Sequence, residues 1–371
     1  MRKTNAKMLF GLSLAVTLSF SACAQNQTLK DAFKDHFYIG VALNEAQSLG
    51  KKAAETAIIK EQFNSITPEN CMKWERIHPM PNEYRFALAD SFVALGERNH
   101  MFMIGHCMVW HAQTPDWVFQ DSLGKPLTRD ALLKRMHDHI LTVIGRYKGR
   151  IQGYDVVNEA LTEEGQMRKS KWFEIIGEDY VEKAFEYAKE ADPNAELYYN
   201  DYNIEMPAKC QGAVKLIKNL QAKGIKVTGV GIQGHYHMNS PSLKNIDQSL
   251  SEYSKLGVKV MFTEVDINVL PSPENLSGAD VSQKFELTKE MNPYPTSLPD
   301  SMQQKLANRY ADFFKIFLKY KNISRVTFWG LEDGHSWLNG WPIPGRTNYP
   351  LLFDRNLQPK AAFYSIIKTA K

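Results

Sequence analysis

The chain has 371 residues, of which 43% are hydrophobic, enough for the core of one large α/β domain. Its formal net charge is +4 and no stretch or stripe of basic residues stands out, so the composition argues against a nucleic-acid-binding protein. Beyond the first 24 residues, no apolar stretch is long enough to predict a membrane-spanning helix.

Residues 1–24 resemble an export signal, because basic residues at positions 2, 3 and 7 precede an apolar stretch of 13 residues, too short to span a bilayer comfortably. Ala22 and Ala24 suit cleavage after Ala24. The small residues before Cys23 also resemble a bacterial lipoprotein site, which would put a lipid anchor on Cys23. Phe20 fits that site poorly, so cleavage is slightly favoured and the anchor stays open. We expect a bacterial protein exported to the periplasm, the medium or the outer surface.

Three further cysteines, Cys71, Cys107 and Cys210, follow at irregular spacing. An odd number of cysteines does not make a disulfide framework, although one pair could still bridge. We interpret these residues as small buried hydrophobic side chains.

Short apolar stretches recur along the rest of the chain and predict strands buried on both faces, as in a parallel sheet. Eight of them lie at 38–42, 65–67, 101–105, 153–157, 197–199, 230–232, 258–263 and 326–329. Helical patterns lie at 46–62, 88–99, 128–147, 172–190, 208–222, 243–255, 302–319 and 360–367. This alternation predicts an α/β fold, a single (β/α)8 TIM barrel over residues 25–371. No phosphate-binding glycine motif follows the first strand, which disfavours an open sheet.

The stretch from Pro271 to Pro299 is the least regular part of the chain and contains five prolines. It follows the seventh predicted strand. We therefore expect a long loop on the face of the barrel where the strands end.

Two glutamates close predicted strands: Glu159 follows the strand at 153–157, and Glu264 follows the strand at 258–263. A carboxylate at the end of a buried strand is costly to desolvate unless a site uses it. In a barrel these strand ends meet on one face, and most enzymes that hydrolyse glycosides use a pair of carboxyl groups. The alternative interpretation is that the two glutamates are unrelated and that each forms a salt bridge at the end of its own strand.

The other strand ends also carry polar or aromatic side chains, and six motifs span them: Pro-Glu-Asn-x-Met-Lys-Trp (68–74), Gly-His-x-x-Val-Trp-His (105–111), Asp-Val-Val-Asn-Glu-Ala (155–160), Gly-Ile-Gln-Gly-His (231–235), Thr-Glu-x-Asp (263–266) and Thr-Phe-Trp-Gly (327–330). In these motifs the chain resembles glycoside hydrolase family 10, the endo-β-1,4-xylanases, and the resemblance extends from about residue 37 to 367. Tyr154 replaces the usual tryptophan, Cys107-Met108 replaces the usual Thr-Leu, and residues 332–335 differ from the usual sequence, which bears on subsite preference.

The resemblance implies a retaining endo-1,4-β-xylanase in which Glu159 is the general acid/base and Glu264 the nucleophile. Such carboxyl groups lie about 5–5.5 Å apart. Asn158 would bind the sugar 2-hydroxyl, and His235, backed by Asp266, would hold the nucleophile. Glu159 would need a raised pKa, and Glu264 would need donors that keep it ionised.

The resemblance also implies a set of substrate contacts. The hydroxyl groups of xylan or xylo-oligosaccharides would be bound before the scissile bond by Glu69, Asn70, Lys73, His106 and Gln233, with Trp110, Trp329 and Trp337 as aromatic walls and Tyr202 beyond that bond. We expect no cofactor, because the chemistry needs none. His106 with His111, or His235 with His237, could otherwise suggest a metal site, but no matching third ligand set is evident.

Two other functions stay open at this point. The first is a retaining β-glycanase that acts on cellulose or mixed-linkage glucan. The second is a barrel that binds cell-wall glycan without cleaving it, which the presence of both glutamates argues against. We expect a monomer.

Overall fold

The structure is a computed structural model that describes residues 27–276 and 278–371. The export signal expected over residues 1–24, with Cys23, lies outside these residues.

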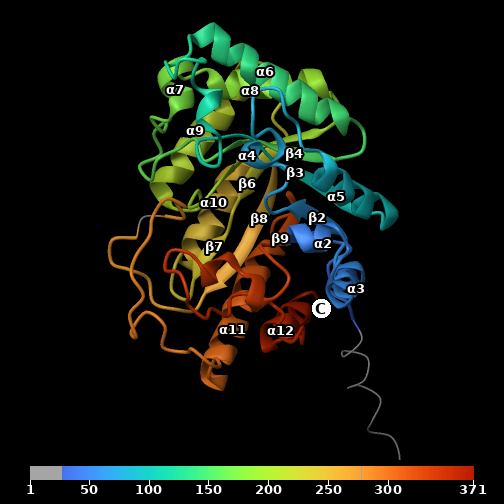
Figure 1. Cartoon of the computed structure of the whole chain (residues 1–371). Helices are drawn as coiled ribbons and strands as arrows, with labels where there is room; N and C mark the ends of the chain where they lie inside the picture. Colours follow the sequence, from blue (N-terminus) through green and yellow to red (C-terminus); the bar gives the residue numbers. More distant parts are fainter. Residues whose placement is uncertain (1–26, 277) are drawn as a thin grey trace, which may run out of the picture.

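Eight parallel strands form a closed barrel at the centre of the molecule (Figure 1). They are β1 (Tyr38–Leu43), β2 (Ser65–Pro68), β3 (Phe102–Trp110), β4 (Gly153–Asn158), β5 (Glu196–Asp201), β6 (Gly229–Ile232), β8 (Lys259–Asn268) and β9 (Ile323–Phe328). Each strand pairs with its neighbour along the chain, β9 pairs with β1, and β6 pairs with β8 to complete the ring. The predicted (β/α)8 barrel is confirmed.

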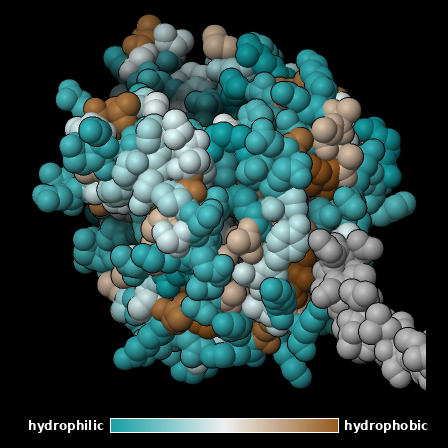
Figure 2. Space-filling model, turned by 90° about the horizontal axis from the view of Figure 1, so that it is seen from below, coloured by the Kyte–Doolittle hydropathy of each residue, from teal (hydrophilic) through white to brown (hydrophobic). Residues whose placement is uncertain are grey.

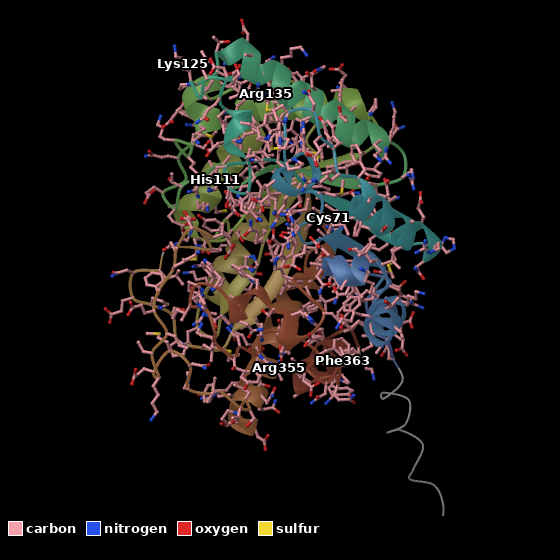
Figure 3. The ribbon with its side chains drawn as sticks, in the orientation of Figure 1. Cys71, His111, Lys125, Arg135, Arg355 and Phe363 are labelled. Carbon is pink, nitrogen blue, oxygen red and sulfur yellow. The ribbon has the colours of Figure 1, made fainter. Side chains whose placement is uncertain are left out.

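Helices surround the barrel, and their apolar faces pack on the outside of the strands. The α-helices are α1 (Leu29–Ala32), α2 (Glu45–Ser48), α3 (Ala53–Gln62), α4 (Trp74–Ile77), α5 (Ala87–Arg98), α6 (Arg129–Arg146), α7 (Lys171–Ile176), α8 (Tyr180–Ala191), α9 (Pro207–Ala222), α10 (Leu243–Lys255), α11 (Asp300–Phe317) and α12 (Ala361–Thr369). Short 3-10 turns lie at η1 (Asp116–Val118), η2 (Asp333–His335) and η3 (Trp337–Asn339). Figure 3 shows Arg135 with α6 at one end of the molecule and Phe363 with α12 at the other.

Two helices predicted as continuous are interrupted, so these predictions were wrong. The stretch 46–62 splits into α2 and α3 around Gly50, whose φ is +66°. The stretch 172–190 splits into α7 and α8 around Gly177, whose φ is +102°. A positive φ cannot continue a right-handed helix, and glycine adopts it at little cost.

A short additional strand, β7 (His235–His237), was not predicted. Gly234, with a φ of +80°, separates it from β6, and it pairs with the far end of β8 so that His235 lies beside Asp266. Strand β8 runs through Glu264 to Asn268, and this glutamate lies inside a strand rather than after it.

The connection from β8 to α11 runs along one side of the molecule (orange in Figure 1), and its described residues 271–276 and 278–299 form no helix or strand. Its middle is tied to the β9–α12 connection, because the Phe285 amide donates to the Pro342 carbonyl (2.9 Å) and the Trp341 indole donates to the Asp280 carbonyl (3.2 Å). The predicted loop is therefore held against the end of the barrel where the strands finish.

Most of the face drawn in Figure 2 is hydrophilic, and its hydrophobic residues form small separate groups. None of the helices in the described part of the chain is long and apolar enough to cross a membrane. Cys71, Cys107 and Cys210 are buried and unpaired with one another.

Candidate active site

The carboxyl ends of the strands surround a cavity of about 160 Å³. It is lined by Glu69, Asn70, Lys73, His106, Trp110, Gln113, Asn158, Glu159, Gln233, His235, Glu264, Ala279, Val281, Trp329 and Trp337. The structure thus brings together every predicted site residue except Asp266 and Tyr202. Gln113, Ala279 and Val281 were not predicted, and the last two come from the connection after β8.

Glu159 follows the last residue of β4 and is almost fully buried, with 5% of its surface exposed. Its carboxyl group accepts hydrogen bonds from the Trp110 indole (2.8 Å), the Gln233 amide (2.9 Å) and the Asn158 amide (3.2 Å). Burial raises the pKa of Glu159 above the ordinary value, and the negative charge of Glu264 adds to this effect. Of the pair Glu159 and Glu264, Glu159 is therefore the carboxyl group that holds a proton more readily.

Glu264 is equally buried and has a different set of donors. One oxygen accepts from the Asn200 amide (2.9 Å), and the other lies 3.1 Å from His235 Nε2. Burial alone would raise the pKa of Glu264, but the hydrogen bond from His235 and the nearby charges of His106 and Lys73 outweigh it and lower the pKa. The pKa values of two carboxyl groups in one cavity are thus shifted in opposite directions, upward mainly by burial for Glu159 and downward by neighbouring donors and charges for Glu264.

His235 connects Glu264 to a second carboxylate. Its Nδ1 lies 3.1 Å from Asp266, which also accepts a hydrogen bond from the Trp337 indole (2.7 Å). Burial opposes the charged form of His235, but the charge of Asp266 and the hydrogen bonds to both carboxylates raise the pKa of His235 to about 10. A protonated imidazole donates from both nitrogens, so it satisfies Glu264 and Asp266 together. Asp266 lies behind the cavity wall.

The two glutamates are joined by a pair of asparagines at the ends of neighbouring strands. Asn200 Nδ2 lies 2.9 Å from Glu264 and 2.9 Å from Asn158 Oδ1, and the Asn158 amide donates to Glu159. The Thr263 hydroxyl donates to Asn200 (2.7 Å), which fixes the orientation of its amide. Asn200 was not predicted as a site residue. Asn200 is paired with Asn158 in the register of β4 and β5, and this pairing of two strand-end asparagines is the signal that could have indicated Asn200 as a site residue.

Polar side chains after β2 and within β3 form another wall. Lys73 donates to Asn70 (3.1 Å) and to Gln113 (2.8 Å), and its ammonium group lies 5.1 Å from the centre of the Trp110 ring. His106 Nδ1 lies 2.9 Å from Asp155, which orients the ring. Burial raises the pKa of Glu69 despite the charge of Lys73. Charged and amide groups of this kind suit a ligand with several adjacent hydroxyl groups.

Indole rings form the apolar part of the cavity. Trp329 packs edge-on against His106, with ring centres 5.5 Å apart. Trp337 is stacked on Trp341 with ring centres 4.5 Å apart, and that stack supports its position. Flat aromatic surfaces suit the apolar faces of sugar rings.

Tyr202 follows β5 and is buried, with 3% of its surface exposed. Its hydroxyl accepts a hydrogen bond from Arg168 (2.8 Å), and the ammonium group of Lys209 lies 3.5 Å from the centre of its ring. The ring also lies against Gly278, where a Cβ atom would come within 2.3 Å of it. Tyr202 does not line the cavity, and its contact with substrate stays a prediction.

His111, labelled in Figure 3, follows β3, and its Nε2 lies 4.0 Å from Glu159. Burial lowers the pKa of His111 to about 4, and the charge of Arg168 contributes, so the ring is neutral at pH 7. Within residues 27–276 and 278–371, no group of three or more His, Cys, Asp or Glu residues is arranged to hold a metal ion.

A (β/α)8 barrel with two buried carboxyl groups facing one cavity of indole rings and hydroxyl-binding side chains defines a glycoside hydrolase. The family model for glycosyl hydrolase family 10 matches residues 28–369, and the chain belongs to that family.

Similar proteins cover nearly the whole chain. Endo-1,4-beta-xylanase A of Xylanibacter ruminicola is 47% identical over 353 residues, which cover 95% of this chain and 96% of that protein. Beta-1,4-xylanase of Dictyoglomus thermophilum is 41% identical and covers 92% of this chain and 90% of its own length. Among solved structures, a GH10 endoxylanase retrieved from a sugarcane soil metagenome superposes with a TM-score of 0.89 at 48% identity, covering 92% of this chain and 99% of that one.

Proposed function

We propose that the protein is an endo-1,4-β-xylanase that hydrolyses xylan with retention of configuration, with Glu264 as the nucleophile and Glu159 as the general acid/base. The observation that carries the proposal is the pair of buried carboxyl groups whose pKa values are shifted in opposite directions, upward for Glu159 and downward for Glu264. The names of the relatives support xylan as the substrate.

In the first step, ionised Glu264 attacks the anomeric carbon while protonated Glu159 gives its proton to the glycosidic oxygen. The bond to the leaving sugar breaks, and a covalent glycosyl-enzyme forms on Glu264. In the second step, Glu159 takes a proton from a water molecule. That water attacks the anomeric carbon and releases Glu264, so each carboxyl group returns to its starting state.

The neighbours of the two glutamates support these roles. His235 donates to Glu264 and keeps it ionised before attack, and Asp266 with Trp337 fixes the imidazole. Asn158, which accepts a hydrogen bond from Asn200, would bind the sugar 2-hydroxyl, a contact that strengthens in the transition state.

Preference for xylose follows from the indole walls. Xylose lacks the hydroxymethyl group of glucose, and Trp329 and Trp337 beside the cavity would clash with that group. Glu69, Asn70, Lys73, His106 and Gln233 would bind the sugar hydroxyls that both substrates share.

The release of reducing ends from xylan, carboxymethyl-cellulose and mannan tests the substrate. We expect the mature wild-type protein to act on xylan and the Glu264→Gln variant to be inactive on all three. A preference for the cellulosic substrate would overturn the assignment of xylan while keeping the chemistry. Inactivity of the folded wild-type protein on all three substrates would instead favour a barrel that only binds glycan.

The dependence of kcat/KM on pH is expected to be bell-shaped. Activity falls on the alkaline side as Glu159 loses its proton, and because burial raises the pKa of Glu159, this limb lies above 4.5, the ordinary value for glutamate. Activity falls on the acidic side as Glu264 gains a proton. The hydrogen bond from His235 helps to lower the pKa of Glu264, so this limb lies below 4.5. A profile that rises steadily from pH 4 to pH 8, measured with a xylo-oligosaccharide, would contradict both assignments.

A further inference from the structure

The backbone at Glu159 has an unusual conformation. Its φ is +57°, in the left-handed region that side chains other than glycine rarely adopt. Such a conformation persists only where neighbouring groups hold it. It turns the chain sharply after β4 and points the Glu159 carboxyl group into the cavity.

Three hydrogen bonds hold the polar backbone groups on both sides of this turn. The amide of Glu159 donates to the Asn200 carbonyl (2.9 Å), and the amide of Ala160 donates to the Tyr199 hydroxyl (3.2 Å). The carbonyl of Glu159 accepts from Arg168 Nε (3.1 Å). Of these three partners, Arg168 alone uses a charged side chain for its hydrogen bond, because the others are a backbone carbonyl and a tyrosine hydroxyl.

The guanidinium group of Arg168 reaches three acceptors at once. Besides the Glu159 carbonyl, it donates through Nη2 to the Leu161 carbonyl (3.2 Å) and to the Tyr202 hydroxyl (2.8 Å). The backbone amide of Arg168 also donates to the Ala160 carbonyl (2.8 Å). Arg168 therefore closes the β4–α7 connection back onto the turn at Glu159.

A buried ion pair anchors both sides of this arrangement. Lys209 Nζ lies 2.9 Å from Asp201, and both side chains are completely buried. The Tyr199 hydroxyl that accepts from Ala160 donates to Asp201 (2.5 Å), and the Tyr202 ring that supports Arg168 packs on Lys209. The turn is thus connected through tyrosines on each side to one fixed pair of charges.

We propose that Arg168 is a positioning residue that holds the left-handed turn at Glu159 and so aims the acid/base carboxyl group at the glycosidic oxygen. The proposal rests on the acid/base role proposed above for Glu159. The hydrogen bonds of Arg168 go to the Glu159 and Leu161 carbonyls and the Tyr202 hydroxyl and not to the Glu159 carboxyl group. Glu264 takes its donors from Asn200 and His235. Loss of Arg168 should therefore impair proton transfer more than nucleophilic attack.

Substrates with different leaving groups separate these two effects. Phenyl β-xylobioside needs protonation of its leaving group, whereas dinitrophenyl β-xylobioside needs little. For Arg168→Met, we expect kcat/KM on the phenyl substrate to fall roughly tenfold or more relative to the dinitrophenyl substrate, a fraction of the effect of removing the acid itself.

Arg168→Lys separates position from charge. Lysine keeps the positive charge but cannot reach the Glu159 carbonyl and the Tyr202 hydroxyl together, so we expect the same selective loss, with the alkaline limb of the pH profile unchanged. Full activity of Arg168→Lys on both substrates would show that charge alone matters and would overturn the proposal.

Two further variants make the outcome unambiguous. Lys360→Met breaks a comparable buried ion pair, with Asp333 at 2.8 Å, and should lower the unfolding temperature without changing the ratio between the two substrates. Glu159→Ala should show the full selective loss. If it does and both folded Arg168 variants do not, the positioning role is wrong. If Glu159→Ala shows no selective loss, the acid assignment is wrong instead.

Discussion

Replacing Glu264 with alanine should abolish hydrolysis of every glycoside, with kcat reduced by roughly 10⁵-fold or more, as for other catalytic nucleophiles. The reason is that no covalent intermediate forms without this carboxylate. A water molecule bound in its place by Asn200 and His235, which donate to Glu264 in the wild type, is not a comparable nucleophile. Initial rates on xylan and on dinitrophenyl β-xylobioside measure the effect. Both substrates should suffer equally, since each requires nucleophilic attack.

Two control variants accompany this measurement. Glu264→Gln keeps the size of the side chain and removes its charge, and it should be about as inactive as Glu264→Ala. Glu55→Gln changes another buried glutamate, on α3, which bonds to Gln47 away from the cavity, and it should retain wild-type activity. Substantial residual activity of a folded Glu264→Ala protein would contradict the nucleophile assignment.

Replacing Glu159 with alanine should have a different signature. Hydrolysis of xylan should fall by about 10²–10⁴-fold, the usual contribution of a general acid. The first step on dinitrophenyl β-xylobioside should be nearly unaffected, because that leaving group departs without a proton. The second step still needs a general base, so a burst of dinitrophenol should precede a slow steady state.

Rapid-mixing kinetics on the two substrates distinguish this outcome from general damage to the site. Trp110→Phe is a useful comparison, because it removes one hydrogen bond to Glu159 and keeps an aromatic ring beside it. We expect it to weaken xylan hydrolysis much less than Glu159→Ala. Equal losses on xylan and on the dinitrophenyl substrate in Glu159→Ala would mean that Glu159 is not the acid.

Much of the fold was predictable because the barrel repeats one local pattern. Each buried strand is a short apolar stretch, and each is followed by a helical pattern, so the eight strands and their parallel arrangement follow from periodicity. The same logic placed Glu159 and Glu264 on one face, since strand ends converge there. The breaks at Gly50 and Gly177 were missed because a single glycine does not reveal its own φ.

The remaining site residues depend on contacts between distant parts of the chain. Gln113 bonds to Lys73, 40 positions away, and it lies in an irregular segment with a φ of +45°, so no periodic pattern marks it. Ala279 and Val281 enter the cavity only because the connection after β8 folds back over the barrel. Arg168 acts on the backbone of Glu159, a contact that no motif of side chains encodes.

The most direct test of the two-carboxylate account is the configuration of the first product. Proton NMR of a xylo-oligosaccharide digest, recorded within the first minutes and before mutarotation, shows which anomer the enzyme releases. Two successive displacements at the anomeric carbon, the first by Glu264, predict that the new reducing end is β. An α product would mean a single displacement by water and would contradict the account.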